Sequence, residues 1–304
     1  ARWLVASDNP LTARVTVNRY WQRFFGLGIA ETENDFGIQG IAPEHPALLD
    51  WLASEFVRLG WGTKAVHRLM VTSSTYRQDS RIRSELVAKD PRNKLLARQS
   101  RVRLEAETIR DISLSASRLL THQVGGPGVY PPQPAGIYAL TQNKKSWPES
   151  QGAARYRRGL YIYFWRSSPY PFLPTFDAPD ATTSCTQRSR SNTPLQALTL
   201  ANDRVFLEMS QGLAERILSL GTSDDESRIR HAFTLCLSRK PSARELEQLT
   251  DFVHRQREHF RAAEKDAKLI APGQIPAGST VADAAAWTAA ARVLLNLDEF
   301  ITRE

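Results

Sequence analysis

The chain has 304 residues, 41% hydrophobic and 24% charged, which is typical of a globular protein with one large core or two smaller ones. The net charge is +8, but basic and acidic side chains are interspersed without a long basic run, so we expect no nucleic-acid partner. No apolar run approaches the length of a bilayer, so we expect no membrane span. The chain begins at Ala1 without a methionine or a signal peptide, and we expect it to be a fragment of a longer protein.

Helical spacing dominates the first 120 residues. Glu107 and Asp111 lie four residues apart on one predicted helix, with Arg110 beside them, and they predict a solvated or salt-bridged face. Prolines near the start and glycines at the end of two segments favour helices there. The predicted helices run from Asn9-Pro10 to Gly26, from Pro43 and Pro46 to Gly60, from Thr63 to the polar cluster at 73–77, from Asp90 to Arg98, and from Leu104 to Leu120.

Two segments then break this helical pattern. Residues 125–134 are rich in glycine and proline and predict a surface loop. Residues 156–166 are aromatic and β-branched, with Leu160, Ile162 and Phe164 alternating onto one side, and are the best strand candidate. We interpret the aromatic residues on the other side as a second packing face, in preference to a platform for sugars or bases.

The stretch 175–203 carries more unusual chemistry than the rest of the chain. It contains two aspartates, a cysteine and two arginines in an irregular segment, followed by a helix start. Thr193 can cap that helix, Pro194 suits its first position and Gln196 is placed to complete a capping box. Helix N-termini favour anions, so a functional site is expected here if the chain has one.

The remaining sequence predicts further helices. The helix that begins at Thr193 continues at helical spacing to Ile217. Ser242 and Glu245 form a capping box that starts another helix, residues 263–280 have the composition of a loose linker, and the last helix starts at Val281.

These elements predict a mainly α fold, an irregular multi-helix bundle with long ordered loops and one or two short strands. We expect a single large helical domain over residues 1–304. A division into 1–122 and 156–304, around the Gly/Pro-rich loop, is the alternative.

Two cysteines cannot make a disulfide framework. Cys236 lies in an apolar helical run and is expected to be a small core residue, whereas Cys185 lies in a polar loop. A bridge between them stays open, because spacing does not decide it. The sequence contains no C-x-x-C, C-x-x-C-H or H-E-x-x-H pattern, so we assign no metal site and expect no cofactor in this chain.

Several long motifs occur in a fixed order: WGTKAVHRLMVTSSTYRQDS, RLEAETIRD, GGPGVYPPQP, YRRGLYIYFWR and TFDAPDATTSCTQRSRSNTPLQALTLAND. In these motifs the chain resembles the domain of unknown function 1553, which is typical of planctomycete multidomain proteins. The resemblance covers nearly the whole chain, and residues 138–154 depart from it.

The resemblance implies a context but no reaction, since none is established for that family. It implies an exported protein, periplasmic or extracellular, with upstream domains of the same polypeptide as partners. It also implies a c-type cytochrome domain elsewhere in the parent protein, which would hold haem c, and organisms rich in polysaccharide degradation.

Two hypotheses on function follow. The first is a binding or docking module that works with the cytochrome domain and with anionic polysaccharides. The alternative is a redox or hydrolytic enzyme acting on carbohydrate, with a site around 177–190; a structural pairing of the same residues, or a calcium site from Asp177, Asp180 and carbonyls, would also account for them. The catalytic candidates are Asp177, Asp180, Cys185 and His45, and the binding candidates are Arg188, Arg190, Arg110, Arg158, Arg166, Asn192 and Gln196.

Overall fold

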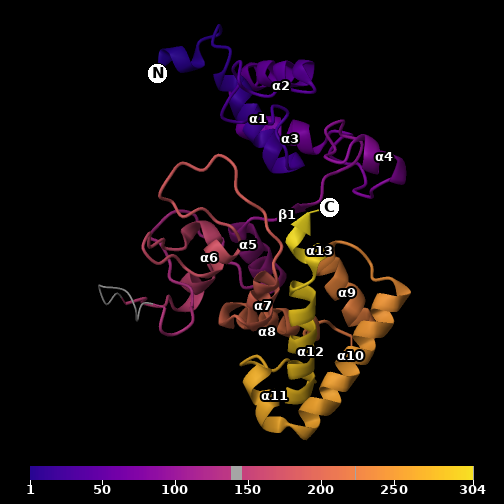
Figure 1. Ribbon diagram of the computed structural model, residues 1–304. Coiled ribbons are helices and arrows are strands. Elements are labelled where there is room, and N and C mark those ends of the chain that lie inside the picture. The colour runs from indigo at the N-terminus through magenta and orange to yellow at the C-terminus, as the bar shows by residue number, and fades with distance from the viewer. Residues whose placement is uncertain (138–145, 223, 304) are drawn as a thin grey trace. The chain divides into compact units, whose positions relative to one another are not determined.

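A computed structural model describes residues 1–137, 146–222 and 224–303, and it is mainly α, as predicted. Residues 138–145, in the stretch that departs from the family motifs, lie outside the described residues. The chain divides into two compact units (Figure 1). Unit 1 comprises Ala1–Arg103 and the last residues from Thr302, and unit 2 comprises Leu104–Ile301. The boundary precedes the Gly/Pro-rich loop, and the expectation of one domain over the whole chain stays a prediction.

Unit 1 is built on three helices around a small apolar core. They are α1 (Thr12–Phe25), α2 (Pro46–Arg58) and α3 (Thr63–Val71), and α1 contacts both of the others. Their apolar faces supply the core because the buried residues recur at helical spacing. The unit also contains the 3-10 helix η1 (Arg2–Val5), α4 (Ser84–Lys89), and the antiparallel strands β1 (Val102–Arg103) and β2 (Thr302–Arg303).

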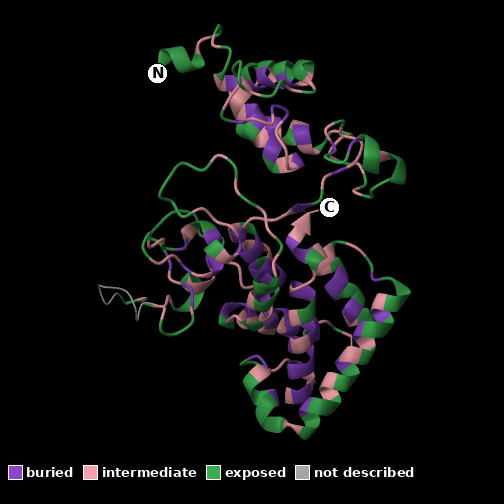
Figure 2. Ribbon diagram, in the orientation of Figure 1, coloured by how far each residue is buried: buried purple, intermediate pink, exposed green. Residues whose placement is uncertain are grey.

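Unit 2 is organised around α12 (Val281–Leu295), which is buried along most of its length (Figure 2). Alanines at 282, 284–286 and 290–291 give this helix a thin profile, and α8 (Arg204–Leu218) and α10 (Ala243–Ala262) pack against it. Small side chains allow such close packing between helix axes. The other helices of the unit are α5 (Ala106–Ala116), α6 (Phe172–Thr175), α7 (Pro194–Asn202), α9 (Asp225–Leu237), α11 (Glu264–Ile270) and α13 (Asp298–Ile301).

The two predicted capping boxes are confirmed. Two helix predictions and the linker prediction are wrong. The helix from Thr193 ends at Asn202, because Asp203 is extended (φ −66°, ψ 136°) and caps α8 by accepting the amide of Val205. No helix covers 90–98, where the carboxylate of Asp90 accepts the amides of Lys94 and Leu95. The expected loose linker contains α11, stabilised by buried Ala267 and the ion pair of Lys268 with Glu264.

The strand prediction for 156–166 is also wrong. This segment contains the end of the 3-10 helix η2 (Gly152–Tyr156) and η3 (Gly159–Tyr161), and it meets other segments through isolated bridges only at Arg157 and Ile162. Val129 donates its amide to the carbonyl oxygen of Tyr161 and accepts the amide of Tyr163, both at 2.8 Å, and side chains of α5 hold the start of the segment. Asp111 accepts the amide of Gly159 at 2.6 Å, and Arg110 donates to the carbonyl oxygens of Arg155 and Arg157.

Within the described ranges of the chain, no helix combines the length and the apolar character that crossing a membrane requires.

We predict that Gly159→Ala destabilises the protein by about 2 kcal/mol, because overpacking of this kind costs about 1–3 kcal/mol. A Cβ at this position would lie 2.7 Å from the Cα of Glu107 on α5, where neither backbone can move freely. Urea unfolding measures the effect. Gly273→Ala is the control, since a Cβ there meets no atom within 4 Å, and equal destabilisation by both variants would contradict the packing at Gly159.

We also predict an acid-sensitive contribution at the start of α10. Hydrogen bonds from Arg239 lower the pKa of Glu245 from 4.5 to about 2. Ionised Glu245 therefore stabilises the fold above about pH 4.5, and this contribution is lost as the pH falls toward 2. Glu245→Gln keeps a capping-box side chain but does not titrate. The free energy of unfolding should fall less between pH 5 and pH 2 in this variant than in the natural protein, as measured by denaturant titration; parallel curves would refute the assignment.

Candidate functional site

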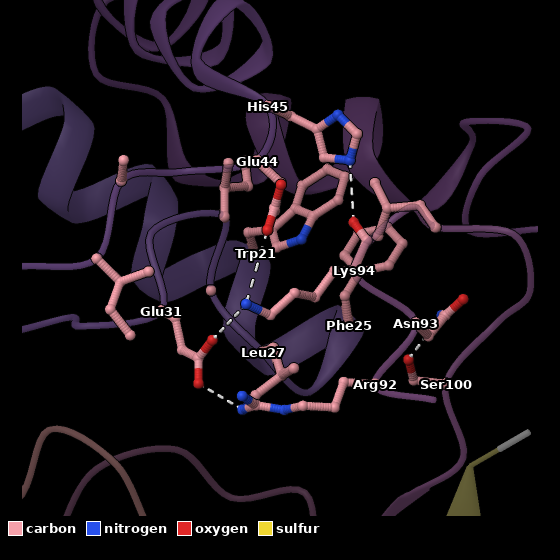
Figure 3. A pocket seen from close by; sticks show the side chains of 15 residues that line it. Trp21, Phe25, Leu27, Glu31, Glu44, His45, Arg92, Asn93, Lys94 and Ser100 are labelled. Carbon is pink, nitrogen blue, oxygen red and sulfur yellow. Dashed lines mark hydrogen bonds and ion pairs between the residues drawn. The ribbon is translucent and has the colours of Figure 1, made fainter. Parts of the chain in front are cut away.

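Unit 1 contains a small pocket of about 40 Å³ that opens to solvent (Figure 3). Two loops and one helix build it: the loop that joins α1 to α2, the loop at 92–100, and α1 itself. The apolar lining side chains are Trp21, Phe25, Leu27, Ile29, Ile41, Ala42 and Leu96, and the polar ones are Glu31, Glu44, His45, Arg92, Asn93, Lys94 and Ser100.

Four charged side chains form a chain of alternating sign across this pocket (Figure 3). Arg92 pairs with Glu31, the ammonium of Lys94 lies 3.1 Å from the other oxygen of Glu31, and it lies 3.7 Å from Glu44. The hydrogen bond from Arg92, followed by that from Lys94, lowers the pKa of Glu31. The pocket thus carries two acids and two bases, so its formal charge is balanced at neutral pH.

His45, predicted as a catalytic candidate, lies in the wall of this pocket. Its Nε2 is 3.0 Å from the carbonyl oxygen of Lys94. A carbonyl oxygen only accepts, so Nε2 carries the proton and the ring fixes the 92–100 loop against the start of α2. This contact makes His45 a positioning residue of the pocket.

The same loop is held from inside by side chain to backbone bonds. Asn93 has a left-handed conformation (φ 54°) and donates to the carbonyl oxygen of Arg98 at 2.8 Å. Together with the two amides accepted by Asp90, this bond fixes the backbone beneath Arg92 and Lys94. These hydrogen bonds therefore fix the loop that carries Arg92 and Lys94 at the pocket.

The opposite wall depends on the loop after α1. Buried Asn18 accepts the amide of Ala30 and donates to its carbonyl oxygen, both at 2.9 Å. The backbone at Gly28 passes close to the side-chain amide of Asn18, because a Cβ at Gly28 would lie 2.7 Å from that side chain. Asn18 thus determines the path of the backbone that presents Glu31.

In unit 2, Asp177, the first aspartate of the stretch 175–203, closes a loop. Asp177 has a positive φ of 60° and accepts the amide of Ser191 at 2.8 Å and its hydroxyl at 2.9 Å. Buried Gln196 donates to the hydroxyl oxygen of Ser191 at 3.0 Å and to the carbonyl oxygen of Thr175 at 2.9 Å. Asp177 and Gln196 therefore hold both ends of the loop 178–190 at the start of α7.

Arg188 anchors the far part of this loop to α5. Its Nη1 lies 2.7 Å from Glu107 and 3.3 Å from Glu105. The predicted charged face of α5 is thus salt-bridged, and its polar residues hold two segments that are far apart in sequence. Asp111 pairs with Arg158 at 2.6 Å, and fully buried Arg110 holds the carbonyl oxygens of Arg155 and Arg157.

The other predicted site residues lie elsewhere along the loop and in the segments next to it. Asp180 accepts the amide of Thr182, which lowers the pKa of its carboxyl group, and the exposed Cys185 thiol donates to the carbonyl oxygen of Gln187. Exposed Asn192 lies 3.4 Å from Asp298. Arg166 is exposed and Arg190 is half-buried.

The structure separates several candidates that were considered together. His45 belongs to unit 1, whereas the other ten candidates belong to unit 2. Both cysteines are free, so the bridge between Cys185 and Cys236 does not form. Among the residues that the structure describes, no three His, Cys, Asp or Glu side chains gather to hold a metal ion.

Sequence reasoning missed most of the pocket. Glu31 and Arg92 are 61 residues apart, and they meet through loops that carry no periodicity. The Asp90-Pro91 pair was a usable signal, because it marks a turn in which the aspartate can accept backbone amides.

We predict that Asp177→Ala destabilises the protein by about 1–3 kcal/mol, because two partly buried donors of Ser191 lose their acceptor and alanine tolerates the positive φ poorly. Asp180→Ala, at an exposed position, should change the stability by less than about 0.5 kcal/mol. Denaturant unfolding of both variants provides the comparison. An Asp177→Ala protein as stable as the natural chain would show that this carboxylate is not a structural group.

The model of a protein family described as "Protein of unknown function (DUF1553)", PSD1, matches residues 1–253 of this chain. The match spans both the pocket of unit 1 and the closed loop of unit 2, and it confirms the resemblance. No curated protein and no solved structure matches the chain. The chain therefore belongs to the PSD1 family of proteins of unknown function, DUF1553.

Proposed function

We propose that this chain is a binding module, and that the pocket of unit 1 takes the hydroxyl groups along one edge of a neutral carbohydrate unit, because its volume of about 40 Å³ does not hold a whole ring. The observation that carries the proposal is the alternating row of Arg92, Glu31, Lys94 and Glu44 beside apolar side chains. A sugar hydroxyl both donates and accepts hydrogen bonds, so it can bond to carboxylates and to cationic groups in the same site. The apolar C–H face of a sugar ring suits the side chains of Leu27, Ile41 and Leu96.

The charge balance favours a neutral sugar over a sulfated one. Glu31 compensates Arg92 and Lys94 at close range, so a sulfate group would have to compete with an existing carboxylate. We therefore propose a neutral carbohydrate in place of the anionic polysaccharide partner that was expected from the sequence. The expected context, an exported parent protein with a separate c-type cytochrome domain and upstream domains as partners, is part of the proposal.

The enzyme hypothesis has less support. A catalytic acid, base or nucleophile needs to approach a substrate in a shared site. Asp177 is engaged by Ser191, Arg188 is engaged by Glu105 and Glu107, and His45 is engaged by the carbonyl of Lys94. These contacts account for the three residues as supports of loops.

Binding of neutral and sulfated oligosaccharides of the same backbone to the full chain tests the proposal. We predict that a neutral oligosaccharide binds, that its sulfated counterpart binds more weakly, and that Arg92→Gln weakens neutral binding at least about tenfold, since hydrogen bonds to charged groups contribute about 1.5–3 kcal/mol. Isothermal titration calorimetry measures the affinities.

Arg14→Gln is the matched control, because it removes another partly exposed arginine paired with a carboxylate, Asp50, at a position that does not line the pocket. Its affinity should equal that of the natural chain. Absence of binding to every neutral oligosaccharide, or equal affinities of the Arg92→Gln and natural proteins, would refute the proposal.

A further inference from the structure

Unit 2 contains a second hollow, separate in sequence from the pocket of unit 1. It is an open groove of about 600 Å³ between the C-terminal ends of α5 and α9. Ile112, Leu120, Leu235 and Phe300 supply its apolar lining. A groove of this size and character is on the scale of small-ligand pockets.

The ionisable residues that line this groove bring no negative charge. Arg118 and Arg216 are cationic, and His122 is neutral or cationic. The thiol of Cys236 also lines the groove, and burial raises its pKa to about 12, so it stays uncharged at neutral pH. No aspartate or glutamate is among the lining residues, in contrast to the balanced pocket of unit 1.

Arg118 is held at the groove by the turn that ends α5. Its amide donates to the carbonyl oxygen of Ser115 at 3.1 Å, and the amide of Leu119 donates to that of Leu114 at 2.9 Å. These two bonds define a Schellman turn, in which the position of Arg118 is left-handed, here with φ 64°. Glycine is the usual residue there, so an exposed arginine at this position is an unfavourable choice for the backbone alone.

Arg216 approaches the groove from α8. Its Nη1 donates to the carbonyl oxygens of Ala116 at 2.9 Å and Ser115 at 3.2 Å, at the end of α5. The guanidinium is therefore fixed in place before any ligand arrives, which reduces the entropy lost on binding. Two arginines thus stand at the C-terminal end of α5, beside an apolar surface.

We propose that this groove binds a small amphipathic anion, with a carboxylate at Arg118 and Arg216 and an alkyl chain on Ile112, Leu120, Leu235 and Phe300. Charge complementarity selects the anionic head, and burial of methylene groups supplies the affinity. A plain anion would leave the apolar lining without a partner, and a neutral hydrocarbon would leave the two arginines without an opposite charge. This proposal is independent of the carbohydrate site, which lies in the other unit.

Calorimetric titration with three probes below their critical micelle concentrations tests the proposal. Decanoate carries head and chain, acetate carries the head alone, and decyltrimethylammonium carries the chain with the opposite charge. We expect decanoate to bind at least tenfold more tightly than either of the others. Equal binding of decanoate and decyltrimethylammonium, or of decanoate and acetate, would overturn the proposal.

The Arg118→Gly variant separates binding from folding. Glycine suits the left-handed position, so the variant should unfold at the same or a higher denaturant concentration, while its affinity for decanoate falls at least tenfold. Arg118→Lys should restore part of that affinity by restoring the charge. Unchanged decanoate binding in Arg118→Gly would refute the role of this arginine.

The thiol of Cys236 gives a second readout in the full chain. In a Cys185→Ser background, alkylation of Cys236 by iodoacetamide at alkaline pH reports access to the groove. Decanoate should slow this alkylation at least threefold and acetate should leave it unchanged. Alkylation at the same rate with and without saturating decanoate would place the ligand elsewhere and overturn the assignment.

Discussion

The buried guanidinium of Arg110 is the constraint on which the irregular part of unit 2 depends. It is fully buried, and burial lowers its pKa, so it needs hydrogen-bond acceptors from the chain itself. The carbonyl oxygens of Arg155 and Arg157 provide them, at 2.8 and 3.4 Å. A segment whose carbonyls face a helix in this way cannot pair regularly with a strand, so residues 152–161 form short 3-10 helices along α5.

The neighbours of Arg110 on α5 also hold segments that are distant in the sequence. Glu107 holds Arg188, and Asp111 holds Arg158 together with the amide of Gly159. One helix of eleven residues thus fixes two loops that are far apart in sequence. Networks of this kind resemble active sites in composition, because both require charged groups at close range. Here the acids and arginines account for one another, and we therefore propose ligand binding at the two hollows instead.

Those hollows differ in the way their charges are arranged. The pocket of unit 1 alternates acid and base, and its loops are supported by Asn18, Asp90 and Asn93. The groove of unit 2 has a cationic rim and an apolar lining. A balanced rim favours ligands with many weak donors and acceptors, whereas a cationic rim favours one full negative charge. For this reason we propose a different class of ligand for each unit.

The sequence by itself determined the helical class, the family and the starts of several helices. Capping boxes such as Thr193 with Gln196, and prolines such as Pro46, act within a few residues, so they can be recognised locally. The tertiary structure alone decided the conformation of 156–161 and the pocket around Glu31. Each of these depends on a partner distant in the chain, such as Arg110 for the carbonyl of Arg157 or Arg92 for Glu31. Periodicity carries no information about such partners, because they meet only when the core has brought their segments together.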